Sequence, residues 1–112
     1  MNKLVITGYL ETEPKIWETE AAKIACFSIA HSDTSSPTTD VHNVVVSNDY
    51  LVDMLVKHLQ KNMHLQVEGR LRNRWISKDD GTEVAVAEIV IDNFYGGIEI
   101  LSSAKNVSNL GA

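Results

Sequence analysis

The sequence predicts an all-β domain with five main strands and one α-helix between the third and the fourth strand. Short runs of β-branched and apolar residues, separated by glycine, proline and polar clusters, are typical of strands. One segment instead repeats its apolar residues at spacings of three and four, which is typical of an amphipathic helix. A chain of 112 residues, 44% hydrophobic and 22% charged, is long enough for one domain with a modest core.

Three strands are predicted ahead of the helix, over residues 4–10, 23–30 and 41–46. Pro14 and the acidic residues before it end the first strand, and residues 15–17 extend it beyond a bend. Residues 31–40 are polar and rich in breakers, so we expect an exposed loop between the second and third strands.

The helix is predicted from about residue 49 to residue 61. Its apolar stripe consists of Leu51, Met54, Leu55, His58 and Leu59. Ser47 or Asn48 can cap the first turn. Lys57 and Lys61 suit the negative end of the helix dipole, and Asn62 is a typical left-handed stop.

Two strands follow the helix, over about residues 64–76 and 83–91, with a turn at residues 78–81. Gly81 supplies the positive φ that such a turn requires. Residues 94–101 predict a last edge strand, bent at Gly96 and Gly97. This order is the arrangement of a five-stranded Greek-key barrel of the OB-fold type. We expect the domain to span residues 1–101 and residues 102–112 to form a short flexible tail.

The composition excludes several classes of protein. No apolar run approaches the roughly 20 residues that span a bilayer, and the N-terminal apolar stretch is too short for a signal peptide. We therefore expect an intracellular protein without a membrane partner. Cys26 is the only cysteine, which rules out an internal disulfide, and its apolar neighbours predict a buried, inert thiol.

Motifs of catalysis and of cofactor binding are absent from the sequence. It contains no glycine-rich phosphate loop and no nucleophile elbow. The four histidines, His31, His42, His58 and His64, do not have the spacing of metal-ligand pairs. We expect no enzyme activity, no cofactor and no metal.

The charges are distributed unevenly. The net charge of −5 taken alone opposes nucleic-acid binding, but residues 57–78 hold six basic residues and one acidic residue, Glu68. The basic residues are Lys57, Lys61, Arg70, Arg72, Arg74 and Lys78. Arginines at alternate positions share one face of a strand, where they can follow a phosphate backbone. The alternative is a solvated face that Glu68 and nearby acids balance.

Several segments resemble bacterial single-stranded-DNA-binding proteins, in order along the chain. Residues 2–10, Asn-Lys-Leu-Val-Ile-Thr-Gly-Tyr-Leu, with Glu13 and Pro14 after them, are similar to the start of that family. Residues 27–32 and 42–46 resemble its second and third strands. Residues 59–62 and 67–74 resemble its Leu-Lys-Lys-Gly and Ile-Glu-Gly-Arg-Leu-Arg-Thr-Arg segments, and Gly81 and residues 88–90 keep the spacing of its hairpin.

This resemblance covers residue 2 to about residue 101 and implies an OB-fold. It implies single-stranded DNA as the partner, in replication, repair and recombination, and a cytoplasmic, nucleoid-associated location. It also implies self-association, with a tetramer favoured and a dimer as the alternative, and it places His42 at a subunit interface.

The sequence departs from this family at the aromatic residues that stack on bases. The segment 32–40 contains no aromatic residue, Val41 and Ser47 stand where Trp and Phe are usual, and residues 85–87 replace Tyr-Thr-Thr. The Trp position of the hairpin falls on Ile76, with Trp75 one residue early. The family's acidic tail with its Pro-Phe end is also missing. A shortened chain would account for the tail, and without it other replication proteins have no such segment to bind.

Two functions remain open from the sequence. The first is non-specific binding of single-stranded DNA by Arg70, Arg72, Arg74 and Trp75, assisted by Lys57, Lys61 and Lys78. The second is an oligomeric OB module with weak or lost DNA binding that acts in protein interaction or replication restart.

The role of the aromatic residues near these strands also stays open. Trp75 lies on the other face from the arginines in a regular strand, whereas a bulge near Asn73 would bring it beside them. Base stacking and packing within the hairpin are both open for Trp75. For Trp17 and Tyr9, packing is favoured over base stacking.

Overall fold

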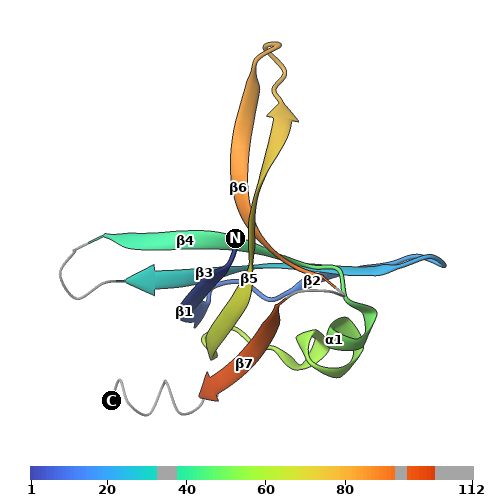
Figure 1. Cartoon of the computed structure of the whole chain (residues 1–112), viewed down its shortest axis with the longest axis vertical. Helices are drawn as coiled ribbons and strands as arrows, with labels where there is room; N and C mark the ends of the chain where they lie inside the picture. Colours follow the sequence, from blue (N-terminus) through green and yellow to red (C-terminus); the bar gives the residue numbers. More distant parts are fainter. Residues whose placement is uncertain (33–37, 93–95, 103–112) are drawn as a thin grey trace.

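Five strands form a closed ring in the computed structural model, which describes residues 1–32, 38–92 and 96–102 (Figure 1). The strands are β1 (Leu4–Leu10), β3 (Lys23–Ser32), β4 (Thr39–Val46), β5 (His64–Ser77) and β6 (Glu83–Ile91). They are hydrogen-bonded in the order β1-β3-β4-β6-β5, and β5 pairs back onto β1. Two short strands lie outside the ring: β2 (Lys15–Glu18) pairs with β3, and β7 (Gly97–Ser102) pairs with β5. The predicted OB-fold is confirmed.

The core lies inside the ring and is built from alternate residues of each strand. Side chains of a strand point to opposite faces in turn, so one set faces inward and the other outward. The fully buried inward set includes Ile29, Val44, Leu65, Val67 and Ile89. The outward set of the same strands is available for other roles.

The helical segment is shorter than predicted, and only part of the predicted stripe is buried, with Leu59 buried fully and Leu51 partly. α1 covers Asp49–Met54, and a 3₁₀ turn, η1, covers Val56–His58. The helix ends early because Leu55 leaves helical geometry, with φ −126° and ψ −55°. The buried residues are Val52, Val56 and Leu59, whereas Met54 is 60% exposed.

The two asparagine signals are confirmed, whereas the last turn of α1 contains neither Lys57, which lies in η1, nor Lys61. The Asn48 side chain accepts a hydrogen bond from the backbone N–H of Leu51 at 3.1 Å, which caps α1. Asn62 has the predicted left-handed backbone, with φ 75°.

The long hairpin of β5 and β6 rises from the ring as a separate arm (Figure 1). β5 pairs with β1 up to Gly69 and with β6 from Arg70 onward. Gly69 allows this crossing, because a Cβ there would lie 2.6 Å from the backbone oxygen of Val90. At the tip, the predicted turn forms with Gly81 at φ 89°.

The remaining strand predictions are confirmed with small shifts. β1 and β6 have the predicted bounds, while β3, β4 and β5 extend one or two residues further. β7 covers 97–102 rather than 94–101, and residues 93–95 and 103–112, with most of the predicted tail, lie outside the described residues. Within the described segments, no helix is long and apolar enough to cross a membrane.

Candidate nucleic-acid interface

The outer face of the sheet is continuous from β2 to the hairpin. Directly paired residues project to the same face of a sheet. One row therefore runs across five strands, through Lys15, Cys26, Val45, Val90 and Arg70. The next row runs through Ser28, Asn43, Glu88 and Arg72. The face thus carries Lys15 and Trp17 at the β2 side and the three arginines at the β5 side.

The three predicted arginines lie together on this face. Arg70 and Arg72 donate hydrogen bonds to acidic residues, and Arg74 makes a longer ion pair. Arg72 donates from Nε to Oε1 of Glu88 at 3.0 Å, and Arg74 Nε lies 3.6 Å from Oε2 of the same carboxylate. Arg70 Nη2 lies 3.3 Å from Oδ2 of Asp92. Glu88 is only 3% exposed, whereas the side chains of Arg72 and Arg74 are 41% and 58% exposed. A buried carboxylate therefore offsets part of the positive charge of the face.

Trp75 lies on the opposite face of the hairpin. The pairing of β5 with β6 runs in unbroken register from Arg70 opposite Val90 to Ser77 opposite Glu83. Without a bulge in this stretch, Trp75 is on the face that alternates with the arginines, opposite Ala85 and 66% exposed. The structure does not bring Trp75 beside the arginines.

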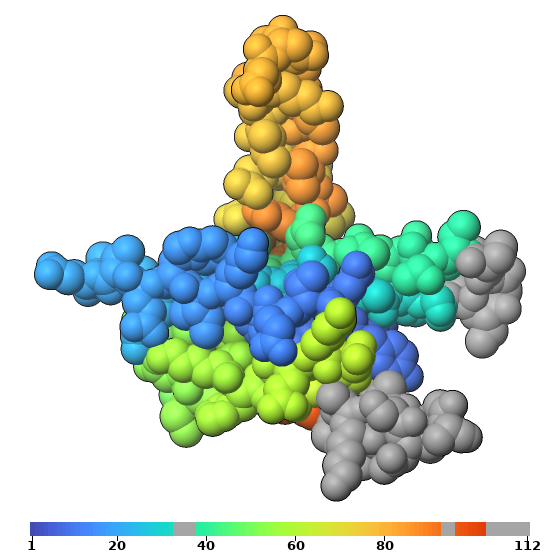
Figure 2. All heavy atoms as spheres, turned by 180° about the vertical axis from the view of Figure 1, so that it is seen from behind, coloured from blue at the N-terminus to red at the C-terminus, as the bar shows by residue number. Residues whose placement is uncertain are grey.

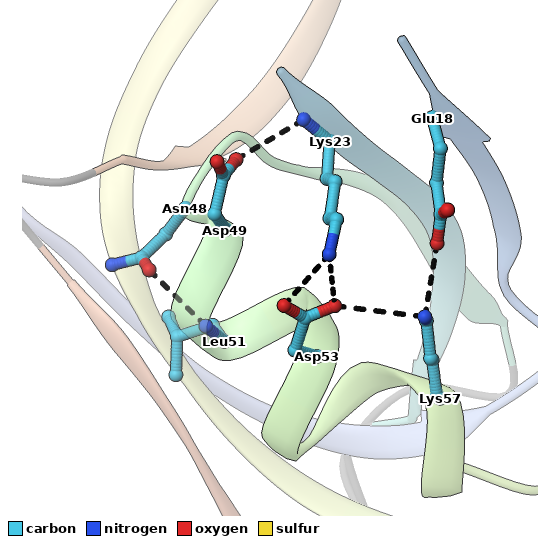
Figure 3. Close-up of polar contacts among 7 residues, drawn as sticks. All are labelled: Glu18, Lys23, Asn48, Asp49, Leu51, Asp53 and Lys57. Carbon is cyan, nitrogen blue, oxygen red and sulfur yellow. Dashed lines mark hydrogen bonds and ion pairs between the residues drawn. The ribbon is translucent and has the colours of Figure 1, made fainter. Parts of the chain in front are cut away.

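Lys57 lies away from the arginines, in an ion-pair network between β2 and the helix (Figure 3). Its Nζ is 2.9 Å from Oε1 of Glu18 and 3.5 Å from Oδ1 of Asp53, which also contacts Lys23 at 2.7 Å. The hydrogen bond and charge of Glu18 raise the pKa of Lys57, and Lys57 lowers the pKa of Glu18. Lys23 is the main cause of the lowered pKa of Asp53.

The other predicted residues are spread over the molecule. Lys61 is exposed in the turn after η1, and Lys78 is exposed at the hairpin tip, at the far end of the molecule from α1 (Figure 1). His42 is half-buried opposite Ile29. Tyr9 stacks on His64, with ring centroids 4.5 Å apart.

A cleft that was not predicted from the sequence lies between β2 and the base of the hairpin. Its volume is about 460 Å³, and its lining includes Lys15, Trp17, Ser28, Asn43, Arg74 and Glu88. Trp17 is 53% exposed there, so packing does not account for its whole side chain. The local signal was Lys15 and Trp17 at alternate positions, which puts both on one face of a strand.

Cys26, which we expected to be buried, is half-buried on the floor of this cleft. Cys26 occupies an outward position of β3, next to Val45 of β4, rather than an inward one. Burial is the larger cause of its raised pKa, and the charge of Glu88 adds to the effect.

A basic and aromatic outer face on a five-stranded OB barrel defines a class of protein that binds oligonucleotides or oligosaccharides. Residues 1–96 match the single-strand binding protein family. The chain belongs to this family.

Curated relatives and solved structures resemble nine tenths or more of the chain. A single-stranded DNA-binding protein of Rickettsia felis is 30% identical, over 97% of this chain and 77% of the relative. One of Bacteroides thetaiotaomicron is 30% identical, over 100% of this chain and 73% of the relative. The Plasmodium falciparum SSB, solved in complex with ssDNA, is 27% identical with a TM-score of 0.81, covering 91% of this chain and 96% of that one. The mitochondrial protein Rim1 of Saccharomyces cerevisiae, with a TM-score of 0.72 and 24% identity over 90% of this chain and 95% of that one, shares the fold.

Proposed function

We propose that this protein binds single-stranded DNA without sequence preference, through the outer face of β2, β3, β4, β6 and β5. The strongest support is the row of three arginines on that face, in a chain similar to a protein solved with ssDNA. Guanidinium groups contact phosphates and stack on bases, and neither interaction depends on base identity. Binding of this kind serves replication, repair and recombination, where single strands are exposed, and needs no catalytic step.

Arg74 is the arginine best suited to test this function. Arg74 and Arg72 both contact Glu88, but Arg74 is the more exposed of the two and makes the longer contact. Its removal should therefore disturb the fold less than the removal of Arg72. Lys57→Ala is the control, since it makes the same change of charge. The ammonium group of Lys57 is already paired with Glu18 and Asp53, so it is not expected to bind a phosphate. Arg74→Ala should weaken binding about tenfold, the effect of one charged hydrogen bond. Lys57→Ala should leave binding nearly unchanged.

The measurement is the fluorescence anisotropy of a labelled poly-dT oligomer, titrated with the full chain at low and at moderate salt. Binding at low salt that weakens as salt rises supports the proposed function, because bound phosphates release counterions. Absence of binding by the native chain at low salt would overturn it. Equal effects of Arg74→Ala and Lys57→Ala would overturn the assignment of the face.

We also propose that the chain self-associates, as a tetramer or a dimer. Exposed apolar side chains favour an interaction surface, with Val5 and Leu71 each 49% exposed and Trp75 66% exposed. β1 pairs with β3 only at Tyr9 and Leu10, so most of one β1 edge has no strand beside it in the described part of the chain. Light scattering on the purified chain measures the subunit number. Self-association without DNA binding would instead favour a protein-interaction or replication-restart module.

A further inference from the structure

The cleft at β2 joins two parts of the outer face that are distant in sequence. Trp17 and Arg74 both line the 460 Å³ cleft and also an adjoining hollow of about 250 Å³, which Arg72 lines as well. In Figure 2, the blue segment that contains β2 lies below the base of the hairpin, and cyan to green atoms of β3 and β4 adjoin both. The indole and the two guanidinium groups therefore border one continuous depression.

The floor of this depression is low because its residues are small. Cys26 of β3 and Val45 of β4 are paired across the two strands and line both hollows. At one end, Ser28 Oγ donates to Asn43 Oδ1 at 3.3 Å, which adds a polar patch. Trp17 stands beside this floor on the edge strand with half of its side chain exposed. A flat group can therefore reach the indole from the solvent.

The charges around the depression suit a phosphate-linked ligand. Lys15, Arg72 and Arg74 contribute three positive charges, and Glu13 and Glu88 contribute two negative ones. Glu88 is buried and paired with the arginines, so the exposed charges of the rim are those of Lys15, Arg72 and Arg74 against that of Glu13. The volume of about 460 Å³ is within the usual range for small-ligand sites. Aromatic rings and guanidinium planes are the groups on which proteins stack unpaired bases.

We propose that Trp17 is the base-stacking residue of this protein, and that one unpaired nucleobase lies against its indole in this cleft, with Lys15 and Arg74 at the flanking phosphates. This inference rests on the proposed binding of single strands and adds the position of a base. The chain lacks aromatic residues at the positions where its family resemblance places them, and Trp75 is on the wrong face to act with the arginines. The edge strand β2 supplies an aromatic residue on the right face.

Backbone pairing with β3 holds this platform in place. All four residues of β2 pair with β3, and Trp17 lies opposite Ile24. The ion pair of Glu18 with Lys57, with Nζ and Oε1 2.9 Å apart, lies at the end of β2 beside the helical segment (Figure 3). The position of the indole therefore depends on the sheet rather than on Lys57.

The test compares an oligomer of dT with an abasic sugar-phosphate oligomer of the same length. Both carry the same phosphates, and only the first has bases to stack. The native full chain should bind the dT oligomer more tightly than the abasic one at low salt. Trp17→Ala should lose roughly 5- to 150-fold in affinity for dT, the effect of stacking one base. The same variant should leave abasic binding unchanged, and Trp17→Phe should restore most of the preference.

Two exposed aromatic residues provide matched controls. Trp75→Ala removes an indole from the other face of the hairpin, and Tyr50→Ala removes a ring that is 70% exposed on α1. Both variants should keep the native preference for dT. Because the chain has two tryptophans, the tryptophan fluorescence of Trp75→Ala comes from Trp17 alone. It should be quenched by dT and not by the abasic oligomer, a readout that does not require the Trp17→Ala protein to fold.

Each outcome separates the two proposals. If the native chain binds dT but Trp17→Ala binds it equally well, or if dT fails to quench Trp17, the stacking site is wrong and the proposed function stands. If the native chain binds neither oligomer at low salt, the proposed function fails, and the stacking site fails with it. A preference lost in Trp75→Ala rather than Trp17→Ala would move the site to the other face of the hairpin.

Discussion

Glu88 is a buried carboxylate whose charge depends on one main partner, Arg72. Its side chain is 3% exposed, and its Oε1 accepts from Nε and Nη2 of Arg72, while Arg74 Nε is 3.6 Å from Oε2. Arg72→Met keeps the apolar stem of the side chain and removes the guanidinium. In this variant the Glu88 carboxylate stays buried. Of the two arginines only Arg74 still contacts it, at 3.6 Å.

The expected loss of stability depends on how deeply the group that loses its partner is buried, and Glu88 is far more buried than Arg72. Removing one partner of a buried pair destabilises a protein by about 3 to 5 kcal/mol. Arg74 still offsets part of the charge, so we expect Arg72→Met to lower the free energy of unfolding by about 3 kcal/mol. Glu88→Gln leaves arginines that are 41% and 58% exposed and can be hydrated, so it should cost only about 1 kcal/mol. The double variant should be more stable than Arg72→Met, because no buried charge remains.

Urea unfolding of the four proteins at one protein concentration and at neutral pH measures these differences. The concentration is held fixed because self-association would add to the apparent stability. Equal destabilisation by Glu88→Gln and Arg72→Met would mean that the exposed arginines do not tolerate the loss of their counter-ion, which would refute the expected effect of burial. The result also decides how binding data are read, since a variant that loses about 3 kcal/mol of a typical 5 to 15 confounds folding with affinity.

Three further predictions each concern one local feature of the structure. Alkylation of Cys26 should shift to lower pH in Glu88→Gln, because a charge that raises the pKa of the thiol is gone; an unchanged pH-rate profile would contradict this. The two acids beside Lys57 have lowered pKa values, so their stabilisation is present above the pKa of the unfolded chain and is lost as pH falls through the folded pKa. In Lys57→Met, the urea midpoint of unfolding should therefore decrease less as the pH is lowered than it does in the native chain. An equal decrease in both proteins would refute the stabilising role of the ion pairs of Lys57 with Glu18 and Asp53. Gly69→Ala puts a Cβ 2.6 Å from a β6 carbonyl oxygen and should cost about 1 to 3 kcal/mol, whereas Gly97→Ala meets nothing within 4 Å; thermal unfolding should separate the two.

The strands were predictable because their signal is local. Alternation of apolar residues and the breakers around them fix a strand to within one or two residues, as in β1 and β6. The helix was less predictable because spacings of three and four fit two stripes at once. Leu51, Leu55 and His58 satisfy that spacing, and so do Val52, Val56 and Leu59, which the barrel buries. Only the packing of the helix on the ring decides between them.

The site was predictable in part. Period two puts Arg70, Arg72 and Arg74 on one face, and the pairing of β5 with β6 confirms this. The partner of Arg72 is 16 residues away in sequence, and the position of Trp17 depends on a pairing of β2 with β3 that brings it near the hairpin. These residues meet only because the strands close into a barrel, so no local pattern in the sequence predicts their contacts.

The ion pairs on the face also set how strongly salt should affect DNA binding. Four cations line it, and if each neutralised one phosphate, log K would fall with log salt at a slope of about −2.8, or 0.7 per contact. Arg70 and Arg72 are held by Asp92 and Glu88, so only Lys15 and Arg74 should contribute fully, which gives about −1.4.

Glu88→Gln releases one arginine and should steepen the salt slope by about 0.7. Glu83→Gln, which makes the same change of charge on the other face of the hairpin, should leave the slope alone. The measurement is the binding constant for poly-dT over a series of salt concentrations. A native slope near the four-contact value would mean that the strand displaces both acids from their arginines. A shallow slope that Glu88→Gln steepens means that the buried carboxylate of Glu88 limits the electrostatic part of binding, and that stacking has to supply the remainder.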